Sequence, residues 1–396
     1  MLPDFDAVIV GAGLVGSACA LGLTRAGCRV ALIEAVAAPV AATDDARALV
    51  LAPASTAVLN ELGLWPRLVA HAHPITTIAI SDRGGYGSLR LRAADVGLDA
   101  LGYACPADRL HYELRMAAQE ALGNDLQWAT CYQSHRLIDD VLSITLRDHA
   151  GGESGVTTSL LVAADGSSSS VRAALGIAVE QYDYAQSALI AEVEVDRPQA
   201  DTAYEHFTRS GPLALIPRGG NRYVSVQCVA AALADDALAH DEVAYAQMLE
   251  RRFGGRLGRI KMRSPRRAHA LIRQRAQQVT APRAVVIGNA ANTVHPNAAQ
   301  GLNLGLRDVA GLTARANALF GTAQAVALAD YAAARAADHR CTVGFTDWLA
   351  QSYRSPLLPL RLGRRLALAV TDLCPSLKRH LILEASGLPA LARARP

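Results

Sequence analysis

A glycine-rich turn close to the N-terminus has the residue types and spacing of a dinucleotide-binding loop. Gly11, Gly13 and Gly16 form the pattern G-x-G-x-x-G, and an acidic residue, Glu34, follows further along the chain. The first glycine permits a tight turn, the second lets the backbone approach a pyrophosphate, and the third lets a helix pack closely on a strand. A carboxylate at position 34 can accept hydrogen bonds from both hydroxyls of an unphosphorylated ribose. The pattern predicts NAD or FAD, with a purely structural glycine turn as the alternative.

The elements expected around this loop form a βαβ unit. Residues 6–10 are a β-branched apolar run typical of a buried strand, residues 14–26 have helical apolar spacing, and residues 29–33 suggest a second strand. Gly27 is placed to end the helix in the left-handed conformation. The first turn of the helix would offer unpaired N–H groups to phosphates.

Two further predicted strands end at residues suited to ligand binding. The apolar run 161–164 stops at Asp165 and Gly166, and a later run stops at Gly288 and Asn289. The carboxyl ends of parallel strands meet at one edge of a sheet, where ligands of open α/β folds bind. Because Asp-Gly is common in ordinary turns, the first of these endings carries weight only together with the glycine-rich loop.

The segment at residues 293–308 has a dense cluster of Gly, Pro, Gln and Asn residues suited to a ligand-binding loop. It reads T-V-H-P-N-A-A-Q-G-L-N-L-G-L-R-D. Pro296 stiffens a loop, and Gly301 opens a predicted helix whose N-terminus favours negative charge. A capped core helix would account for the leucines but not for the clustered Gly, Pro, Gln and Asn.

Together these segments resemble a family, the class A flavoprotein monooxygenases, and especially the ubiquinone-biosynthesis hydroxylases of the 2-polyprenyl-6-methoxyphenol hydroxylase type. The resemblance covers most of residues 5–315. It implies an α/β fold with a Rossmann-like FAD-binding domain interleaved with a mixed β-sheet substrate domain, plus a helical C-terminal segment. The expected boundaries are 1–74, 101–178 and 280–345 for the FAD-binding domain, 75–100 and 179–279 for the substrate domain, and 346–396 for the C-terminal segment.

The resemblance also implies which residues hold FAD. The arginine of the motif D-A-R-A-L, here Arg47, reaches the pyrophosphate in the family, Arg109 matches a second position beside the cofactor, and Asp165 orients the pyrophosphate arginine. Without the resemblance, each arginine would be interpreted as a solvated surface charge. The expected cofactor contacts are Gly11, Gly13, Gly16, Glu34, Arg47, Arg109, Asp165, Gly166, Gly288, Asn289, Gln300, Gly301, Leu302 and Asn303.

The loop before the last helix carries the expected catalytic positions His295, Pro296 and Gly301. A hydrogen bond within the loop is the alternative role for His295. Backbone N–H groups of Gly301, Leu302 and Asn303 would stabilise negative charge at the flavin N1–C2=O edge.

This loop departs from the family in two places. Asn289 stands where most members have Asp, and Ala299 replaces the glycine of the A-G-Q-G loop. If position 299 requires a positive φ, the alanine costs about 1 kcal/mol there.

The middle of the chain changes to short alternating runs typical of strands, at 187–195, 203–208, 212–216 and 222–229, with a helical stretch at 241–253. Residues 75–92 are expected to add strands to the same sheet. The segments A-Y-E-H-F-T and G-P-L-A-L-I-P resemble the substrate-domain sheet of the family, which would form the wall opposite the flavin. Because side chains alternate along a strand, one face of each strand would line the pocket, but the sequence does not tell which face this is.

Residues 356–373 place leucines on one helical stripe and Arg361, Arg364 and Arg365 on another. Such a helix lies on an anionic membrane or docks on its own domain.

Composition excludes several other classes of protein. With 39 basic and 36 acidic residues, the net charge of +3 gives no nucleic-acid surface. Seven scattered cysteines without a C-x-x-C pair indicate reduced thiols, no metal site and no disulfide reductase. No signal peptide or spanning stretch is recognisable, so we expect a cytoplasmic protein, with peripheral contact at the inner membrane as a further option.

The activity implied by the resemblance is hydroxylation of a polyprenylated phenol with O2 and NADPH or NADH, through a flavin C4a-hydroperoxide. A ubiquinone-biosynthesis complex is the implied partner. Two alternatives stay open: a flavin reductase on the same fold, and a non-catalytic scaffold of such a complex. A tryptophan-type halogenase is disfavoured because neither Lys261 nor Lys378 lies in a matching motif.

Overall fold

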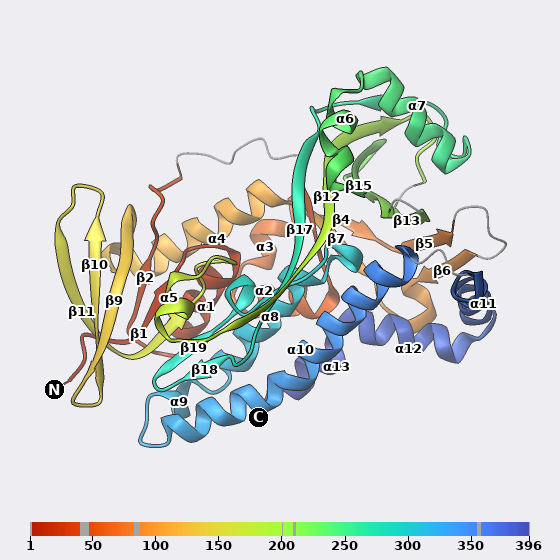
Figure 1. Cartoon of the computed structure of the whole chain (residues 1–396). Helices are drawn as coiled ribbons and strands as arrows, with labels where there is room; N and C mark the ends of the chain where they lie inside the picture. Colours follow the sequence, from red (N-terminus) through yellow and green to blue (C-terminus); the bar gives the residue numbers. More distant parts are fainter. Residues whose placement is uncertain are drawn as a thin grey trace.

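The computed structural model describes residues 2–39, 47–82, 88–199, 201–208, 211–354 and 358–395. Within these ranges the strands form an eight-stranded, a nine-stranded and a three-stranded sheet. The eight-stranded sheet with its helices makes up one end of an elongated molecule, and the nine-stranded sheet makes up the other (Figure 1).

The eight-stranded sheet has a parallel centre. Strand β1 (Phe5–Val10) pairs in parallel with β2 (Val30–Ile33) and with β11 (Glu153–Ala163), and β11 pairs in parallel with β19 (Ala284–Val286). The segments that pair in parallel are apolar and buried, as in residues 7–10 of β1 and 160–163 of β11, because the centre of a parallel sheet is covered on both faces. Its other members are β8 (Leu126–Gln127), β9 (Thr130–Ile138), β10 (Val141–Asp148) and β18 (Thr280–Ala281).

The βαβ unit predicted from the first glycines is confirmed. Helix α1 (Leu14–Arg25) joins β1 to β2, and Gly27 follows it with a φ of +84°. Packed with α1 are α4 (Ala107–Leu122) and α8 (Gln300–Thr313).

The nine-stranded sheet is antiparallel except where β13 runs parallel to β5. The strands expected in the middle of the chain are all present, and those expected within residues 75–92 extend the same sheet. Its members are β5 (Thr77–Asp82), β6 (Ser88–Arg92), β12 (Val179–Val195), β13 (Thr202–Thr208), β14 (Gly211–Pro217), β15 (Arg222–Ala230), β16 (Ile260–Met262), β17 (Arg267–Ala276) and β20 (Asn292–Thr293).

One face of this sheet is covered by helix α7 (Glu242–Phe253). Asp241 caps the helix by accepting a 2.6 Å hydrogen bond from the Ala244 N–H, and Gly254 ends it with a φ of +65°. Tyr204 and Leu215 of the sheet pack against Leu249 and its neighbours on α7. Because side chains alternate along a strand, the neighbours of Tyr204 and Leu215 face the opposite side.

A third, small sheet consists of β3 (Ala48–Leu51), β7 (Gly102–Pro106) and β4 (His73–Ile75). Its strands stand at the points where the chain passes from one large sheet to the other. The remaining α-helices are α2 (Pro53–Glu61), α3 (Trp65–Leu68), α5 (Ser170–Ala174), α6 (Ala234–Ala239) and α9 (Ala316–Leu319). Single 3-10 turns stand at Val69–His71, Ala93–Val96, Gly123–Asp125, Ala231–Leu233, Gly288–Ala290 and Asn297–Ala299.

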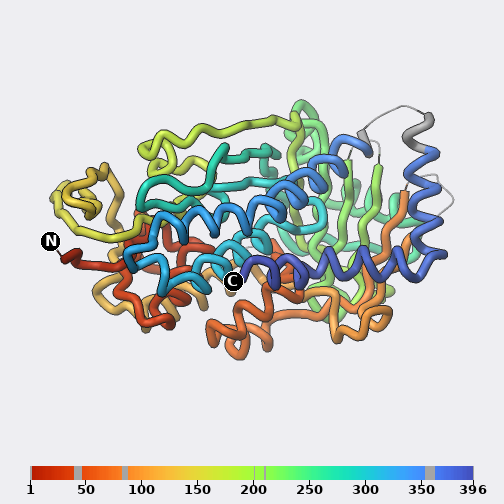
Figure 2. The backbone as a smooth tube through the Cα atoms, turned by 90° about the horizontal axis from the view of Figure 1, so that it is seen from below, coloured from red at the N-terminus to blue at the C-terminus, as the bar shows by residue number. Residues whose placement is uncertain are grey.

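The C-terminal helices are α10 (Gln324–Arg354), α11 (Leu358–Leu373), α12 (Pro375–Ser386) and α13 (Leu388–Ala394). Figure 2 shows α12 and α13 returning along the molecule toward α10. Among the described residues, no helix combines the length and hydropathy needed to cross a membrane.

A buried charge network joins α10 to α8. Arg335, 0% exposed, donates from Nε to Asp308 Oδ1 at 2.9 Å, and its Nη1 lies 2.8 Å from Asp338 Oδ2. His339 Nε2 lies 2.7 Å from the same Asp308 oxygen, and Arg307 pairs with Asp338 at 2.7 Å. Burial raises the pKa of Asp308, but His339 and Arg335 outweigh it and the net shift is downward. The network therefore holds an ionised carboxylate in the core.

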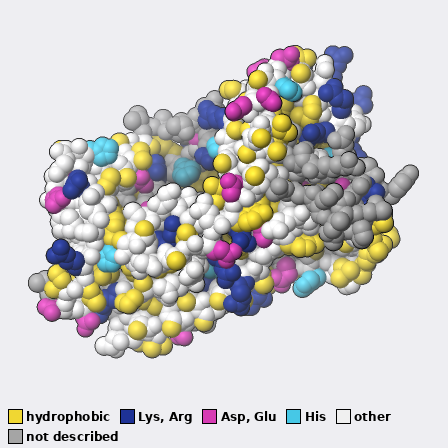
Figure 3. All heavy atoms as spheres, viewed as in Figure 1, with side chains coloured by type: hydrophobic (Ala, Val, Ile, Leu, Met, Phe, Trp, Pro, Cys, Tyr) yellow, Lys and Arg dark blue, Asp and Glu magenta, His cyan; other side chains and the backbone are white. Residues whose placement is uncertain are grey.

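Helix α11 packs through one side and exposes the other. Leu368 packs with Leu89 and Leu91 of β6, whereas Leu366 and Leu373 are 65% and 83% exposed. The apolar stripe predicted for this helix is therefore turned to solvent, and hydrophobic side chains gather over α11 and α12 in Figure 3. Pro356 and the side chains of Leu358 and Arg361 lie outside the described part of the chain.

Candidate functional site

One cavity of about 670 Å³ brings the three predicted motifs together. Gly13 from the first loop, Gly166 from the end of β11 and Gly301 from the start of α8 all line it. Its opposite wall is the face of the nine-stranded sheet that α7 leaves uncovered. The volume lies in the range typical of small-molecule and cofactor sites.

The first loop shows why glycine stands at its positions. A Cβ added at Gly11, whose φ is +104°, would lie 2.5 Å from the Ala164 oxygen, and one at Gly16 would lie 1.8 Å from the Gly11 oxygen. A Cβ at Gly13 would meet nothing within 4 Å, because this residue faces the cavity. The first and third glycines thus pack the βαβ unit, and the second leaves space for a ligand at the N-terminus of α1.

Glu34 lies behind this loop rather than in the wall of the cavity. Its Oε2 accepts a 2.7 Å hydrogen bond from the Ala12 N–H, and its Oε1 accepts one of 3.0 Å from the Val36 N–H. Arg115 donates to the Ala12 carbonyl at 2.8 Å and lies 3.6 Å from Glu34. Both side chains hold the loop. No sequence motif singles out Arg115, because it lies inside an ordinary amphipathic helix, α4.

The two predicted arginines separate in the structure. Arg47 lines the cavity together with the following strand, β3, while Asp45 and Ala46 of its motif lie outside the described residues. Arg109 lies 3.5 Å from Glu113 on the same helix and is absent from the described lining, which takes His111 from that helix instead. Cofactor binding by Arg109 stays a prediction, and the position of Arg109 outside the described lining gives it no support.

Asp165 caps helix α5 at the rim of the cavity. Its Oδ2 accepts hydrogen bonds from the Val171 N–H at 3.1 Å and from Ser170 Oγ at 3.2 Å. Its Oδ1 is buried and has no hydrogen-bond partner among the described residues. Buried Arg172 donates to the Ala290 carbonyl at 2.8 Å, which ties this motif to the third one.

The third motif curls around the cavity in an unusual backbone conformation. Ala298 and Ala299 have φ values of 56° and 51°, so the requirement for a positive φ anticipated at position 299 is confirmed and extends to its neighbour. Pro296, Leu302 and Asn289 also line the cavity. Gly288 is buried, and its N–H donates to Asp308 Oδ2 at 3.3 Å.

Two polar residues of this motif serve the loop rather than the cavity. Asn303 accepts hydrogen bonds from the Ala52 N–H at 2.8 Å and from Ser55 Oγ at 2.6 Å, and it donates to the Val50 and Ala299 carbonyls at 2.9 and 2.7 Å. Gln300 donates to the Ala298 carbonyl at 3.2 Å. Gly301 and Leu302 lie at the cavity, whereas the Asn303 side chain fastens the loop to β3 and α2.

His295 lies behind the loop and is 1% exposed. Its Nδ1 accepts a 3.2 Å hydrogen bond from the Asn297 N–H, and its ring meets Tyr184 edge-on at 4.9 Å. This is the loop hydrogen bond named as its alternative role, and a direct catalytic role remains untested. Asn297 itself lines the cavity, and its buried Nδ2 has no hydrogen-bond partner in the described part of the chain.

The wall formed by the nine-stranded sheet is mostly apolar. The register aligns Glu205 with Ala214, Ala214 with Val226 and Val226 with Ile190 across four strands. Burial raises the pKa of Glu205 to about 7. In the sequence, Glu205 could be recognised only as the one acid of the predicted strand A-Y-E-H-F-T. The wall includes Ala188, Ile190, Ala203, Glu205, Pro212, Ala214, Ile216, Val224, Val226, Cys228, His269 and Leu271.

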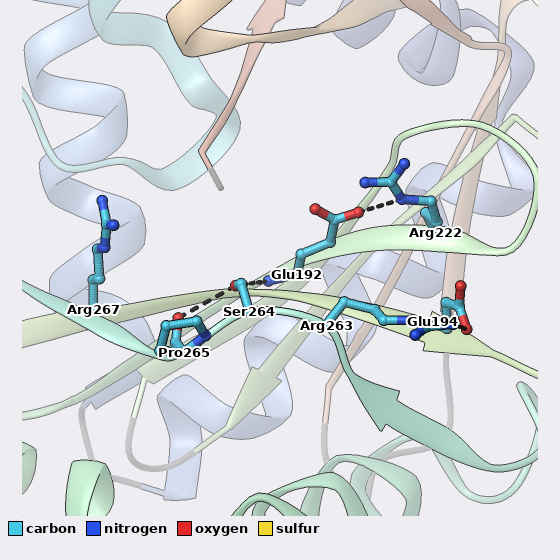
Figure 4. A pocket seen from close by; sticks show the side chains of 7 residues that line it. All are labelled: Glu192, Glu194, Arg222, Arg263, Ser264, Pro265 and Arg267. Atoms are coloured by element: carbon cyan, nitrogen blue, oxygen red, sulfur yellow. Dashed lines mark hydrogen bonds and ion pairs between the residues drawn. The ribbon is translucent and has the colours of Figure 1, made fainter. Parts of the chain in front are cut away.

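A second hollow of about 570 Å³ on the same sheet has a different character (Figure 4). Buried Glu192 pairs there with Arg222 and, at 3.3 Å, with Arg218, and Glu194 pairs with Arg263. None of the predicted site residues lines it. Its carboxylates are balanced by arginines, and five of its seven lining residues are charged, which suits an aromatic ring less well than the wall of the main cavity.

The residues around the main cavity fit a bound flavin dinucleotide. The open space at Gly13 lies at the N-terminus of α1, whose first turn holds no acidic residue. Arg47 adds a positive charge, and the orphaned Nδ2 of Asn297, which lines the cavity, matches a ligand rich in hydroxyls and carbonyls.

Comparison with known proteins agrees with this fit. The sequence profile of the FAD binding domain family matches residues 4–346. The chain is 34% identical over 402 residues to ubiquinone hydroxylase UbiL of Rhodospirillum rubrum, covering 99% of this chain and 91% of that protein. It is 32% identical to the 3-demethoxyubiquinol 3-hydroxylase of Escherichia coli, covering 97% and 98%.

Solved structures share the fold. The p-nitrophenol 4-monooxygenase PnpA of Pseudomonas putida superimposes with a TM-score of 0.77 at 16% identity, covering 98% of each chain. At this level of identity the likeness concerns the fold alone.

Proposed function

Because this chain belongs to the FAD binding domain family and is an FAD-dependent aromatic hydroxylase, we propose that it hydroxylates a polyprenylated phenol of ubiquinone biosynthesis with O2 and NAD(P)H. Two relatives named for ubiquinone hydroxylation, alignable over nearly the whole chain, support this substrate class. The observation that carries the proposal is the single cavity, which has the dinucleotide motifs on one side and an apolar sheet face on the other.

In this proposal the loops on the helix side hold the cofactor. Backbone N–H groups at the start of α1 and the Arg47 guanidinium bind the pyrophosphate, because both are positive and reach the cavity. The amides of Gly301 and Leu302, at the start of α8 and at the cavity, would stabilise negative charge on a bound flavin. Bound FAD supplies hydride acceptance from NAD(P)H and delivery of one oxygen atom from O2.

The sheet side receives the substrate. Ile190, Ile216, Val226 and Leu271 give an apolar surface that excludes water from the ring and accommodates the start of a prenyl tail. The few polar groups on this wall would orient the phenol.

The test uses the purified protein with added FAD and a phenol carrying a short prenyl chain. We expect NAD(P)H oxidation to be stimulated by the phenol, with matching oxygen uptake and a product heavier by one oxygen atom in mass spectrometry. Oxidation indifferent to the phenol would instead indicate a flavin reductase, and protein that takes up no FAD would indicate the scaffold.

We further propose that α11 contacts the membrane from which the prenyl tail is drawn. Leu362, Leu366, Val370 and Leu373 are 54%, 65%, 44% and 83% exposed and lie on one side of this helix. Burying leucine side chains in the lipid interface stabilises the bound state by about 1.5–3 kcal/mol each.

Sedimentation with phosphatidylglycerol-containing vesicles checks this contact. The parent protein should sediment with the vesicles, and the double variant Leu366→Glu, Leu373→Glu should remain in the supernatant. Val326→Glu is the matched control, since Val326 is 62% exposed on α10, away from this row. Equal sedimentation of the double variant and the parent would refute the contact.

A further inference from the structure

Glu205 places a carboxyl group on the apolar wall of the cavity. Its strand β13 pairs with β14 so that Glu205 stands opposite Ala214, and the same row continues through Val226 to Ile190. All four side chains belong to the lining of the cavity. An acid in such a row contributes nothing to apolar packing, and its burial has an energetic cost.

The surroundings of Glu205 explain its protonation behaviour. Burial is the cause that raises its pKa to about 7. Burial also raises the pKa of Cys228 on the same wall, and the charge of Glu205 adds to that rise. Asp82 on the neighbouring β5 lies 3.6 Å from Arg365, which balances its charge. The other ionisable groups lining the cavity are Arg47, His111, Tyr204, Cys228 and His269.

A carboxyl group in this place has a use in the hydroxylation of a phenol. The ring of a phenolate is more electron-rich than that of a neutral phenol, so it reacts more readily with an electrophilic oxygen. A base is most effective when its pKa lies near the working pH, because it is then both available and basic enough. The apolar wall gives the bound hydroxyl few other acceptors.

We propose that the Glu205 carboxylate accepts the proton of the phenolic hydroxyl of the substrate. This inference rests on the proposed function, since it requires a phenol in the cavity. The O–H bond of the phenol breaks, its electron pair stays on the phenol oxygen, and a new O–H bond forms on a Glu205 oxygen. After oxygen transfer, the ring carbon that gained the oxygen loses its hydrogen as a proton, and the second oxygen atom of O2 leaves as water. The proton held by Glu205 returns to the phenol oxygen of the product, so Glu205 is ionised again.

The experiment compares Glu205→Gln and Glu205→Asp with the parent holoenzyme. Glutamine keeps the size of the side chain without its basicity, and aspartate keeps the basicity. The probe is a phenol carrying one isoprene unit, whose ultraviolet phenolate band reports its ionisation when bound. We expect the band to grow as the pH rises through about 7 in the parent and in Glu205→Asp, but not in Glu205→Gln.

Product formation should fall by about 100-fold in Glu205→Gln, while flavin reduction by NAD(P)H keeps its rate. Glu242→Gln, an exposed carboxylate on α7, is the control and should match the parent. A Glu205→Gln variant that ionises the bound phenol like the parent overturns the inference, as does a Glu205→Asp variant that loses as much product formation as Glu205→Gln.

The same measurements separate this inference from the proposed function. If the parent ionises the bound phenol but forms no hydroxylated product, the proposed function fails and proton acceptance by Glu205 stands. If the parent hydroxylates the phenol and Glu205→Gln does so at the same rate, the inference alone fails. A parent that binds no prenylated phenol overturns both.

Discussion

Replacing Ala299 by glycine should stabilise the protein, although most substitutions of alanine by glycine do the reverse. Ala299 has φ 51° and ψ 39°, in the left-handed region that costs an L-residue with a Cβ about 1–2 kcal/mol. Glycine removes this cost but gives the unfolded chain more freedom, which offsets about 0.4–1 kcal/mol. The expected net gain is about 0.5–1 kcal/mol, or about 0.5–1 °C in Tm for a chain of this size.

Urea and thermal unfolding of the cofactor-free protein measure this gain. The matched control is Ala314→Gly at the end of α8, where an exposed alanine has φ −64°, so that glycine should cost about 0.5–1 kcal/mol. The opposite signs of the two variants are the diagnostic result. If Ala299→Gly is destabilised as much as Ala314→Gly, the left-handed backbone at position 299 is not strained and the reasoning fails.

Three further predictions follow from the geometry. Gly13→Ala should fold with an unchanged Tm but bind FAD at least about tenfold more weakly in a fluorescence titration, because its Cβ would project into the cavity. Gly16→Ala should fail to give folded protein, because its Cβ would lie 1.8 Å from the Gly11 oxygen. A Gly13→Ala variant with parental affinity would contradict the site. Arg335→Ala should lose about 3–5 kcal/mol in urea unfolding, because two buried carboxylates, Asp308 and Asp338, would each lose the guanidinium that they share and keep only one cationic partner. A loss below about 1 kcal/mol would show that the network is hydrated. The folded-state pKa of Glu205 is raised from 4.5 to about 7, so the ionised form is disfavoured in the folded state and the parent should lose stability as the pH rises between these values. Glu205→Gln should therefore be more stable than the parent above pH 7, by at most about 3 kcal/mol, and no more stable below pH 4.5; equal Tm differences at pH 4 and pH 8 would contradict this.

Local signals in the sequence were enough for the elements and for the edge of the sheet that binds the ligand. The glycines of the first loop and the strand ending at Asp165 act through short-range geometry, and the structure has them where they were predicted. The left-handed backbone at Ala299 could also be anticipated, because the residue type conflicted with the loop.

Contacts between distant parts of the chain could not be predicted in the same way. Asn303 fastens its loop to Val50, and buried Arg335 meets Asp308, through side-chain geometry that has no periodicity along the sequence. The distinction between Arg47 and Arg109 depends on which side of the fold each element presents. The inward face of the large sheet, and with it the position of Glu205, became defined only through the pairing register.

The short strand β20 pairs with β17, so that Asn292 and Thr293 are hydrogen-bonded to the same strand that contributes His269 and Leu271 to the cavity wall. The loop that follows β20 and the sheet face that walls the cavity are thus connected through one ladder of backbone hydrogen bonds. These peptide hydrogen bonds, rather than a hinge between lobes, set the distance between loop and wall. A molecule too thick for the cavity would therefore strain this ladder, so the cavity should select flat molecules.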